Sequence, residues 1–263
     1  MRDPHSSYQF DLSNRIALVT GASSGLGARM AKVLAAHGAK VALAARRVDR
    51  LDALKAEIED HGGTAMVVPL DVSSEGETVQ AYDAVEATFG IVNTVIANAG
   101  VSTETLRATD TTVDQADRLY EINTKGAFLT AREGAKRMMA TGSRDREDGR
   151  IILTSSITSF DVNGNLALYS GTKAGVSQMG KVLAKDWARM GINVNMIAPG
   201  YIETEINAGM ADADYGRKMI QTWPRRRMAD ADALDGAVLF LCSDQSRQIT
   251  GTVITVDDGQ SLK

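Results

Sequence analysis

A tyrosine and a lysine stand four residues apart in the stretch LYSGTK, residues 168–173. On a helix, side chains at positions i and i+4 lie on the same face, so Tyr169 and Lys173 would be neighbours. A phenol ordinarily has a pKa of about 10 and a lysine about 10.4, but a nearby cation favours the phenolate and lowers the pKa of the phenol. The pair could therefore act as an acid and base at neutral pH, although two surface residues of an ordinary helix would show the same spacing.

Three glycines, Gly21, Gly25 and Gly27, lie in the sequence TGASSGLG directly after the apolar run RIALVT. Glycine permits positive φ and lets the backbone approach a pyrophosphate, which then meets free N–H groups at a helix N-terminus. The spacing is G-x-x-x-G-x-G and differs from the usual G-x-G-x-x-G fingerprint. Its position between the first predicted strand and the first predicted helix nevertheless favours a dinucleotide site.

Two arginines, Arg46 and Arg47, follow the second apolar run of the chain. An acidic residue at the end of this strand would bind the 2′-hydroxyl of NAD, but Ala45 stands there instead. An arginine can hold the 2′-phosphate of NADP by charge-assisted hydrogen bonds. The sequence therefore favours NADP over NAD, with two arginines at a solvated helix entry as the alternative.

Strand-like and helix-like segments alternate along the chain. The predicted strands are 15–20, 40–45, 64–70, 92–98, 150–156, 193–199 and 252–257, and the predicted helices are about 25–38, 48–61, 75–89, 112–140, 167–190 and 231–242. The strands are apolar throughout, as strands covered on both faces are, and βαβ alternation gives a parallel sheet. We predict a single-domain α/β fold over residues 1–263, a Rossmann-type doubly wound parallel sheet of about seven strands with helices on both faces.

Two segments break the alternation. Residues 141–149, TGSRDREDG, are predicted to form a solvated loop, and residues 201–232 are long for a connection. Long connections are usually functional lids or disordered. This one is too apolar for disorder, so we predict that it covers the substrate; its apolar residues include Ile206, Met210, Met219, Ile220 and Trp223. The run Arg225 to Arg227 could contact a phosphopantetheine arm, an acidic carrier or solvent.

Composition excludes several classes of protein. The net charge is −4 with both signs interspersed, so no nucleic-acid partner is expected. The three histidines are far apart, so no metal site is expected, and the single cysteine, Cys242, lies in an apolar helical stretch that predicts a buried thiol. No apolar run approaches the length of a membrane span, and we predict a cytoplasmic protein with no membrane partner.

With TGASSGLG, NAG at 98–100 and YSGTK at 169–173 in this order, the chain resembles the short-chain dehydrogenase/reductase family. The likeness covers about residues 12–260 and extends to LDV at 70–72, INTKG at 122–126, IAPG at 197–200 and VDDG at 256–259. It is similar in particular to NADP-preferring 3-oxoacyl reductase-like and carbonyl reductase-like members. The resemblance implies hydride transfer between NADP(H) and a small-molecule ketone or secondary alcohol, with a 3-oxoacyl thioester among the candidates.

The resemblance also implies catalytic roles. Tyr169 would be the general acid and base, and Lys173 would bind the nicotinamide ribose and lower the pKa of the tyrosine. Ser156, which precedes Tyr169 by 13 residues, would hydrogen-bond the substrate oxygen, and strand alternation should turn the neighbouring Ser155 away. Asn123 would hold a water that links Lys173 to solvent.

A cofactor site follows from the same resemblance. Asp71 and Val72 would flank the adenine, and Thr204 would bond the nicotinamide carboxamide. The family often has two asparagines where this chain has Ala97 and Asn98, a departure of little consequence because the second is present. The full set is Gly21, Ser23, Ser24, Gly25, Leu26, Gly27, Arg46, Arg47, Asp71, Val72, Asn98, Ala99, Gly100, Tyr169, Lys173, Pro199, Gly200, Ile202 and Thr204.

Other functions and assemblies stay open at this point. An NAD(H)-dependent secondary-alcohol or sugar dehydrogenase of the same family, a non-redox lyase or isomerase, and a cofactor-sensing protein are the alternatives. In the family, the helices at about 112–140 and 167–190 pair between subunits. We expect a homotetramer, with a dimer second, because these helices are rich in apolar residues such as Ala127, Phe128, Ala131, Val176, Met179 and Val182. The same residues could instead serve only the core of one subunit.

Overall fold

The chain folds around one parallel β-sheet, and the computed structural model describes residues 10–102, 107–204 and 209–262. Seven strands lie in the order β3-β2-β1-β4-β5-β6-β7, and every neighbouring pair is parallel. They are β1 (Ile16–Thr20), β2 (Lys40–Ala45), β3 (Thr64–Pro69), β4 (Thr94–Ala97), β5 (Gly149–Thr154), β6 (Ile192–Pro199) and β7 (Val253–Val256). The predicted Rossmann-type sheet is confirmed.

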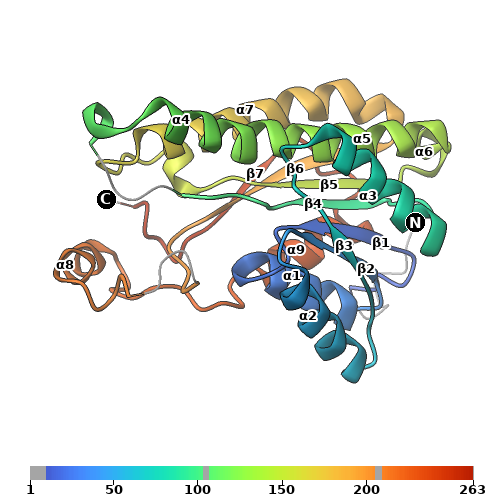
Figure 1. Ribbon diagram of the computed structural model, residues 1–263, viewed down its shortest axis with the longest axis horizontal. Coiled ribbons are helices and arrows are strands. Elements are labelled where there is room, and N and C mark those ends of the chain that lie inside the picture. The colour runs from blue at the N-terminus through green and yellow to red at the C-terminus, as the bar shows by residue number, and fades with distance from the viewer. Residues whose placement is uncertain (1–9, 103–106, 205–208, 263) are drawn as a thin grey trace.

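Helices cover both faces of this sheet (Figure 1). On one face lie α1 (Gly25–Ala36), α2 (Val48–Asp60) and α9 (Asp235–Cys242), and on the other lie α3 (Glu75–Thr88), α4 (Val113–Leu119), α5 (Ala127–Ala140) and α7 (Ala167–Trp187). The described residues also form α6 (Ser143–Arg146), α8 (Asp214–Thr222) and 3-10 turns at Ala108–Asp110, Ile157–Ser159, Ala188–Met190 and Asp244–Ser246.

Alternate residues of a strand face opposite helix layers. Leu18 of β1 lies in the core that α3, α5 and α7 cover, whereas its neighbours Ala17 and Val19 lie in the core under α1, α2 and α9. All three side chains are fully buried. Because both faces are covered, every position of a central strand has to be apolar, which explains the continuous apolar runs in the sequence.

The strand order reverses between β1 and β4. From β1 the chain moves outward through β2 and β3 and then returns to place β4 on the other side of β1. In doubly wound sheets, ligands bind in the crevice outside the carboxyl ends of the strands at such a switch point. The glycine loop after β1 and the segments after β4 and β5 therefore lie at the edge of the sheet where a ligand is expected.

Two local predictions need correction. The segment 141–149 is not simply a solvated loop, because it contains α6 and its Ser143 is fully buried. The Ser143 hydroxyl donates to the carbonyl of Met190 at 2.7 Å. This hydrogen bond holds the turn against the protein, although the residues around Ser143 are polar. The predicted helix at 112–140 is interrupted by a π-helical segment, Tyr120–Gly126, between α4 and α5.

The long connection after β6 contains α8, which Figure 1 shows beyond the end of the sheet near the C-terminus. Trp223, which follows α8, is only 3% exposed. Ile206 and the rest of 205–208 lie outside the described residues. The prediction that this segment covers a substrate remains a prediction.

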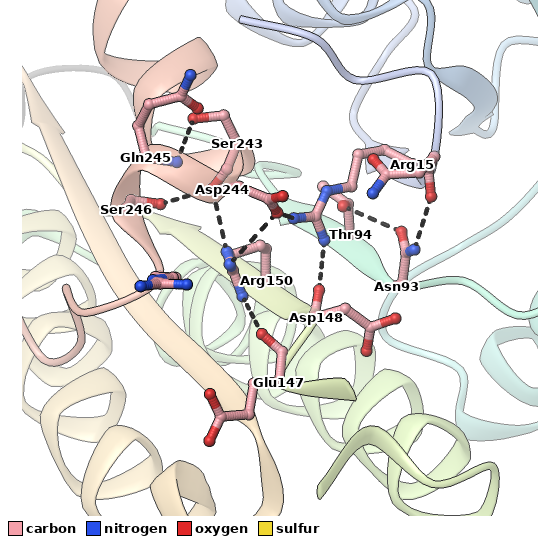
Figure 2. A network of polar contacts seen from close by, with 12 residues as sticks. Arg15, Asn93, Thr94, Glu147, Asp148, Arg150, Ser243, Asp244, Gln245 and Ser246 are labelled. Carbon is pink, nitrogen blue, oxygen red and sulfur yellow. Dashed lines mark hydrogen bonds and ion pairs between the residues drawn. The ribbon is translucent and has the colours of Figure 1, made fainter. Parts of the chain in front are cut away.

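Two buried arginines join elements at the amino ends of the strands (Figure 2). Arg15, just before β1, and Arg150, in β5, are each 1% exposed. Asp244, after α9, lies 2.7 Å from Nη2 of Arg15 and 4.0 Å from Nη2 of Arg150. Arg150 also donates from Nη1 to the carbonyls of Glu147 and Gly149, at 3.1 and 2.9 Å. The network ties β1, β5 and the turn after α9 together.

The described residues contain neither a membrane-spanning helix nor a cluster of potential metal ligands. Within residues 10–102, 107–204 and 209–262, no helix combines the length and apolarity of a membrane span. Nor do the described histidines, cysteines and acidic residues form a cluster of three or more that could hold a metal ion. Cys242 is fully buried, as its apolar surroundings predict.

Candidate active site

Tyr169 and Ser156 meet at the carboxyl end of β5. Ser156 follows the strand and begins the turn Ile157–Ser159, while Tyr169 lies in the first turn of α7. The Ser156 hydroxyl is close enough to the Tyr169 phenol to lower its pKa. Ser155 faces the other way, since its hydroxyl donates to the carbonyl of Lys173 at 3.1 Å and lies 2.6 Å from Oγ of Ser177. Strand alternation thus separates the two serines.

Lys173 lies one turn further along α7 and is 5% exposed. Its Nζ lies 5.7 Å from the centre of the Tyr169 ring and donates to the carbonyl of Thr154 at 2.9 Å. Burial lowers the pKa of Lys173 to about 8. The lysine is therefore charged at neutral pH but can exchange a proton under mildly alkaline conditions.

The pKa of Tyr169 differs from the expectation. Burial raises it, and the nearby Ser156 hydroxyl lowers it only in part. Lys173 is not among the groups that shift this pKa, and its amine donates to the Thr154 carbonyl. Among the protein's own groups, the Tyr169 phenol is thus kept protonated, the form that an acid needs to protonate a carbonyl oxygen.

Asn123 lies in the π-helical segment and is 1% exposed. Its Oδ1 accepts from the Val101 amide at 2.8 Å, and its Nδ2 donates to the Val101 carbonyl at 2.9 Å and to Oγ1 of Thr172 at 3.2 Å. Thr172 in turn donates to the carbonyl of Tyr169 at 2.7 Å. Both amide hydrogens of Asn123 are therefore used within the protein, so the expected water would have to be held by other atoms of this residue.

The glycine loop after β1 has the backbone that a pyrophosphate requires. Gly21 and Gly25 have φ values of +69° and +54°, which other residues rarely adopt. A Cβ on Gly27 would lie 2.2 Å from the carbonyl oxygen of Gly21. Ser24 precedes α1 without capping it through its side chain, so the first N–H groups of the helix face the loop. The loop fits a dinucleotide.

Of the two arginines after β2, Arg47 lies beside this loop. Arg47 donates from Nη2 to Ser24 Oγ at 2.7 Å and to Ser23 Oγ at 3.0 Å. Arg46 is 59% exposed, with Nη1 3.9 Å from Oδ2 of Asp71. The arginine that contacts the glycine-loop serines is therefore Arg47.

The remaining predicted cofactor residues lie along the same edge. Asn98 follows β4 and donates from Nδ2 to the Thr20 carbonyl at 3.0 Å, which joins two strands. A Cβ on Gly100 would come within 3.4 Å of both Asn123 Oδ1 and Lys173 Nζ. Those not yet placed are Leu26 at the start of α1, Asp71 and Val72 after β3, Ala99 after β4, and Pro199, Gly200, Ile202 and Thr204 at and beyond the end of β6.

The segment after β6 reaches the glycine loop. A Cβ on Gly25 would lie 3.5 Å from Cβ of Thr204. Ile202 is buried and pairs with Ala229 as an isolated parallel bridge. The ends of the long connection are thus held together, and its first residues complete the edge on which the predicted nicotinamide contacts lie.

Two residues near Tyr169 were not singled out as site residues by the sequence. Tyr201, after Gly200, stacks on Trp223 with ring centres 5.3 Å apart. Burial, then Tyr215, Tyr169 and Asp161, raise the pKa of Tyr201 to about 12, which puts Asp161 near the same site. The position of Tyr201 directly after the predicted Pro199-Gly200 contact was the available signal, whereas Asp161 had none.

Comparison with known proteins agrees with this geometry. A family model described as Enoyl-(Acyl carrier protein) reductase matches residues 21–261. The chain is 34% identical over 247 residues to the cis-4-hydroxycyclohexanecarboxylate dehydrogenase of Sinomonas cyclohexanicum, which covers 94% of this chain and 96% of that protein. The chain belongs to the short-chain dehydrogenase/reductase family.

Two further short-chain dehydrogenases/reductases show how widely this scaffold is used. The 3-oxoacyl-[acyl-carrier-protein] reductase of Escherichia coli is 32% identical over 254 residues, 96% of this chain and 99% of that protein. A crystal structure of a gluconate 5-dehydrogenase from Burkholderia cenocepacia in complex with NADP and tartrate has a TM-score of 0.90 and 31% identity, and covers 97% of this chain and 98% of that chain. These relatives are oxidoreductases with different substrates.

Proposed function

We propose that this short-chain dehydrogenase/reductase transfers a hydride between NADP(H) and a ketone or secondary alcohol. The observation that carries the proposal is the buried amine of Lys173, 5.7 Å from the centre of the Tyr169 ring, with Ser156 close enough to Tyr169 to lower the pKa of its phenol. Carbonyl reduction needs the protein to orient the substrate and to supply a proton. Two hydroxyl groups beside a glycine loop can do both. A 3-oxoacyl thioester is one candidate substrate.

Each of these residues has a part in the reaction. Bound NADP(H) would supply or accept the hydride at its nicotinamide ring. Ser156 hydrogen-bonds the substrate oxygen, and the Tyr169 hydroxyl gives that oxygen a proton in reduction or takes one in oxidation. Lys173 binds the nicotinamide ribose, and its pKa of about 8 lets it return a proton to the tyrosine. Asn123 fixes the wall behind Lys173 through Val101 and Thr172.

The preference for NADP rests on residues at the end of β2. Arg47 supplies a cation next to the hydroxyls of Ser23 and Ser24, Arg46 supplies a second one beside it in the chain, and Ala45 leaves no carboxylate to repel a phosphate. The complex of the gluconate 5-dehydrogenase relative with NADP supports the same cofactor. The other proposed contacts are those named along the carboxyl edge of the sheet.

An NAD(H)-dependent secondary-alcohol or sugar dehydrogenase is the second candidate. The observation that favours it is the approach of Arg46 to Asp71, at 3.9 Å, which offsets part of the charge that a 2′-phosphate would meet. A lyase, an isomerase or a cofactor sensor on the same scaffold would cause no lasting change in cofactor absorbance. The assay that separates these functions therefore follows the cofactor itself.

The test is a panel of ketones and alcohols assayed with NADPH and NADH in parallel, at the absorbance of the reduced nicotinamide. We expect turnover with NADPH preferred. Arg46→Ala should lower NADPH affinity roughly ten- to a hundredfold through loss of a charge-assisted bond, and leave NADH nearly unchanged. Ala45→Asp should shift the preference towards NADH. A parent enzyme that prefers NADH, or variants that lose both cofactors equally, would contradict the assignment.

We also propose a homotetramer, with a dimer as the second possibility. Several apolar residues that suggested it, including Ala127, Ala131 and Val176, are buried within one subunit. Others on the same helices are exposed: Val113 is 73% exposed and Val182 is 49% exposed. Unpaired apolar side chains on one helical face suit a second copy of the chain. Light scattering that reports a monomer at micromolar concentration would contradict this.

A further inference from the structure

Asp258, in the turn after β7, has a left-handed backbone with a φ of +52°. Arg226, in the connection after β6, has a φ of +49°. They are two of the four non-glycine residues with positive φ in the described part of the chain. Such a conformation is uncommon outside glycine and persists only where the surrounding structure holds it. The two turns that contain these residues are in contact, and that contact holds both of them.

The Asp258 carboxylate binds the two arginines on either side of Arg226. Arg227 donates from Nε to Oδ2 of Asp258 at 2.9 Å, and Nε of Arg225 lies 2.9 Å from Oδ1. The Asp258 side chain is only 18% exposed, although both arginines are more than half exposed. A single exposed ion pair contributes little, but here both oxygens of one largely covered carboxylate are used. We call Asp258, Arg225 and Arg227 the Asp258 clamp.

The two segments that the Asp258 clamp joins both hold Tyr201. From the connection after β6, the ring of the buried Trp223 stacks on Tyr201, and the Ala229 amide donates to the Tyr201 carbonyl at 3.0 Å. From the turn after β7, Oε1 of the buried Gln260 accepts from the Tyr201 amide at 2.6 Å. Nε2 of Gln260 donates to the Tyr201 carbonyl at 3.1 Å. Tyr201 is therefore fixed from both sides of the clamp.

The residues after Tyr201 lead to the glycine loop. Ile202 pairs with Ala229 in the isolated parallel bridge, so the same turn that carries the clamp arginines also holds this segment. A Cβ on Gly25 would lie 3.5 Å from Cβ of Thr204. Ile202 and Thr204 are proposed nicotinamide contacts, whereas the proposed acid and base lies in α7. The clamp therefore holds a wall of the cofactor site and not the proton donor.

We propose that Asp258 is a positioning residue for cofactor binding, because it holds residues 200–204 beside the glycine loop through Arg225 and Arg227. The inference rests on the proposed function and adds to it a residue outside the predicted cofactor contacts. Asp258 supplies no group to hydride or proton transfer. Loss of its carboxylate should weaken binding of the cofactor and leave the rate at saturation nearly unchanged, which is the pattern for a lost binding contact.

The first test is Asp258→Asn. Asparagine matches aspartate in shape and tolerates a left-handed backbone, so the substitution removes the charge and keeps the turn. We expect Kd and KM for NADPH to rise roughly fivefold, with kcat within about twofold of the parent. Cofactor titration and steady-state kinetics measure these values. An unchanged affinity would overturn the proposal, as would a kcat that falls as far as the affinity.

A second variant separates the carboxylate from the backbone conformation. Asp258→Gly relieves the left-handed conformation and also removes the carboxylate. It should therefore match Asp258→Asn in cofactor affinity, whatever its stability. A glycine variant that binds NADPH as tightly as the parent would show that the carboxylate does not position the site, and would overturn the proposal.

The arginines provide the matched control. Arg226→Met removes a charge from the same run and from a left-handed position, but Arg226 forms no ion pair within the described residues. Its cofactor affinity should stay within about twofold of the parent. Arg225→Met with Arg227→Met should weaken NADPH binding as Asp258→Asn does, and adding Asp258→Asn should have no further effect. An equal loss in the control, or fully additive losses, would contradict the clamp.

Trp223 gives a readout in the cofactor-free protein. The chain has two tryptophans, so Trp187→Phe leaves Trp223 as the one fluorophore of its kind. In this background Asp258→Asn should raise the acrylamide quenching of Trp223, because the turn that carries it is released, and Arg226→Met should not. Unchanged quenching in Asp258→Asn would refute the clamp.

The two proposals fail in different ways. If the parent neither binds nor turns over NADPH or NADH, the proposed function fails and the role of Asp258 in cofactor binding fails with it. If the parent turns over a cofactor and Asp258→Asn binds that cofactor equally well, the inference alone is refuted.

Discussion

The two ends of the sheet bury cations in opposite ways. At the amino ends, Arg15 and Arg150 are surrounded by Asp244 and backbone carbonyls (Figure 2). At the carboxyl ends, the Lys173 amine donates a single hydrogen bond among the described residues, to the carbonyl of Thr154. Burial lowers the pKa of both kinds of cation, that of Arg150 to about 10 and that of Lys173 to about 8. Only the lysine can change charge near neutral pH.

The contrast distinguishes buried cations that stabilise the fold from a buried cation that can take part in the reaction. A buried charge with many partners holds elements together, and removing it leaves the partners unsatisfied. A buried ionisable group with few partners costs stability but is ready to bind a ligand or move a proton. Substitutions of the arginines at the amino ends should therefore lower the free energy of unfolding and leave turnover unchanged. Substitutions at the carboxyl ends should change turnover, and removal of the buried lysine charge should not lower stability at neutral pH.

The largest effect is expected at the carboxyl end. Tyr169→Phe removes the ionisable hydroxyl but keeps the ring, so kcat should fall roughly 10³-fold, within the range for loss of an acid–base group. Cofactor binding and the free energy of unfolding should change little. Stopped-flow or steady-state assays and cofactor titration check this. If the variant turned over nearly as fast as the parent enzyme, Tyr169 would not be the general acid and base.

The next effect lies at the amino end. Arg150→Met should lower the free energy of unfolding by about 3 kcal/mol, because the carbonyls of Glu147 and Gly149 lose their donor and Asp244 loses a cation. Urea denaturation measures it. Arg146→Met, which breaks the more exposed contacts with Asp148 and with the carbonyl of Thr141, is the matched control and should cost under about 1 kcal/mol. A Michaelis constant or kcat altered in the folded Arg150→Met enzyme would break the contrast.

Lys173→Met tests how much the burial of the lysine charge lowers the free energy of unfolding. Unfolded lysine keeps its proton up to a pKa of about 10.4, whereas the folded group releases it near pH 8. Between these values the unfolded state binds more protons, so the stability of the parent rises with pH relative to the variant, by up to about 3 kcal/mol. At pH 7 the variant should be at least as stable as the parent. Urea denaturation at pH 7 and pH 10 checks this, and a pH-independent difference would refute it.

The smallest effect is expected at Thr172. Thr172→Val leaves a buried N–H of Asn123 without its acceptor and should cost about 1 kcal/mol and a few-fold in kcat. Thr172→Ser keeps the hydroxyl and should match the parent in both. Unfolding and steady-state kinetics on the two variants measure this. Equal behaviour of serine and valine would show that the hydroxyl does not position Asn123.

Much of this site could be predicted from local sequence. Gly21 and Gly25 adopt the positive φ that their position in a strand-to-helix turn suggested. Ser156 lies close enough to the Tyr169 phenol, 13 residues further along the chain, to lower its pKa. Such features depend on a short segment and on strand ends that a parallel sheet always brings to one edge.

Other features depend on contacts between distant segments. Ser143 looked solvated among charged residues, but its partner is a carbonyl after α7. The pKa of Tyr169 could not be judged from Lys173 alone, because burial of the phenol raises it. Neither the hydrophobic periodicity nor a motif of one segment predicts contacts with a distant segment.

The single cysteine has a practical consequence. Cys242 is the last residue of α9 and is buried, and this burial raises the pKa of its thiol to about 12. Maleimides and similar reagents will therefore not modify it in the folded protein. A cysteine placed at the exposed Tyr215 of α8 would then be the one reactive thiol of the chain. A fluorophore attached there would report on the surroundings of α8 in the otherwise unmodified enzyme, without prior removal of a native cysteine.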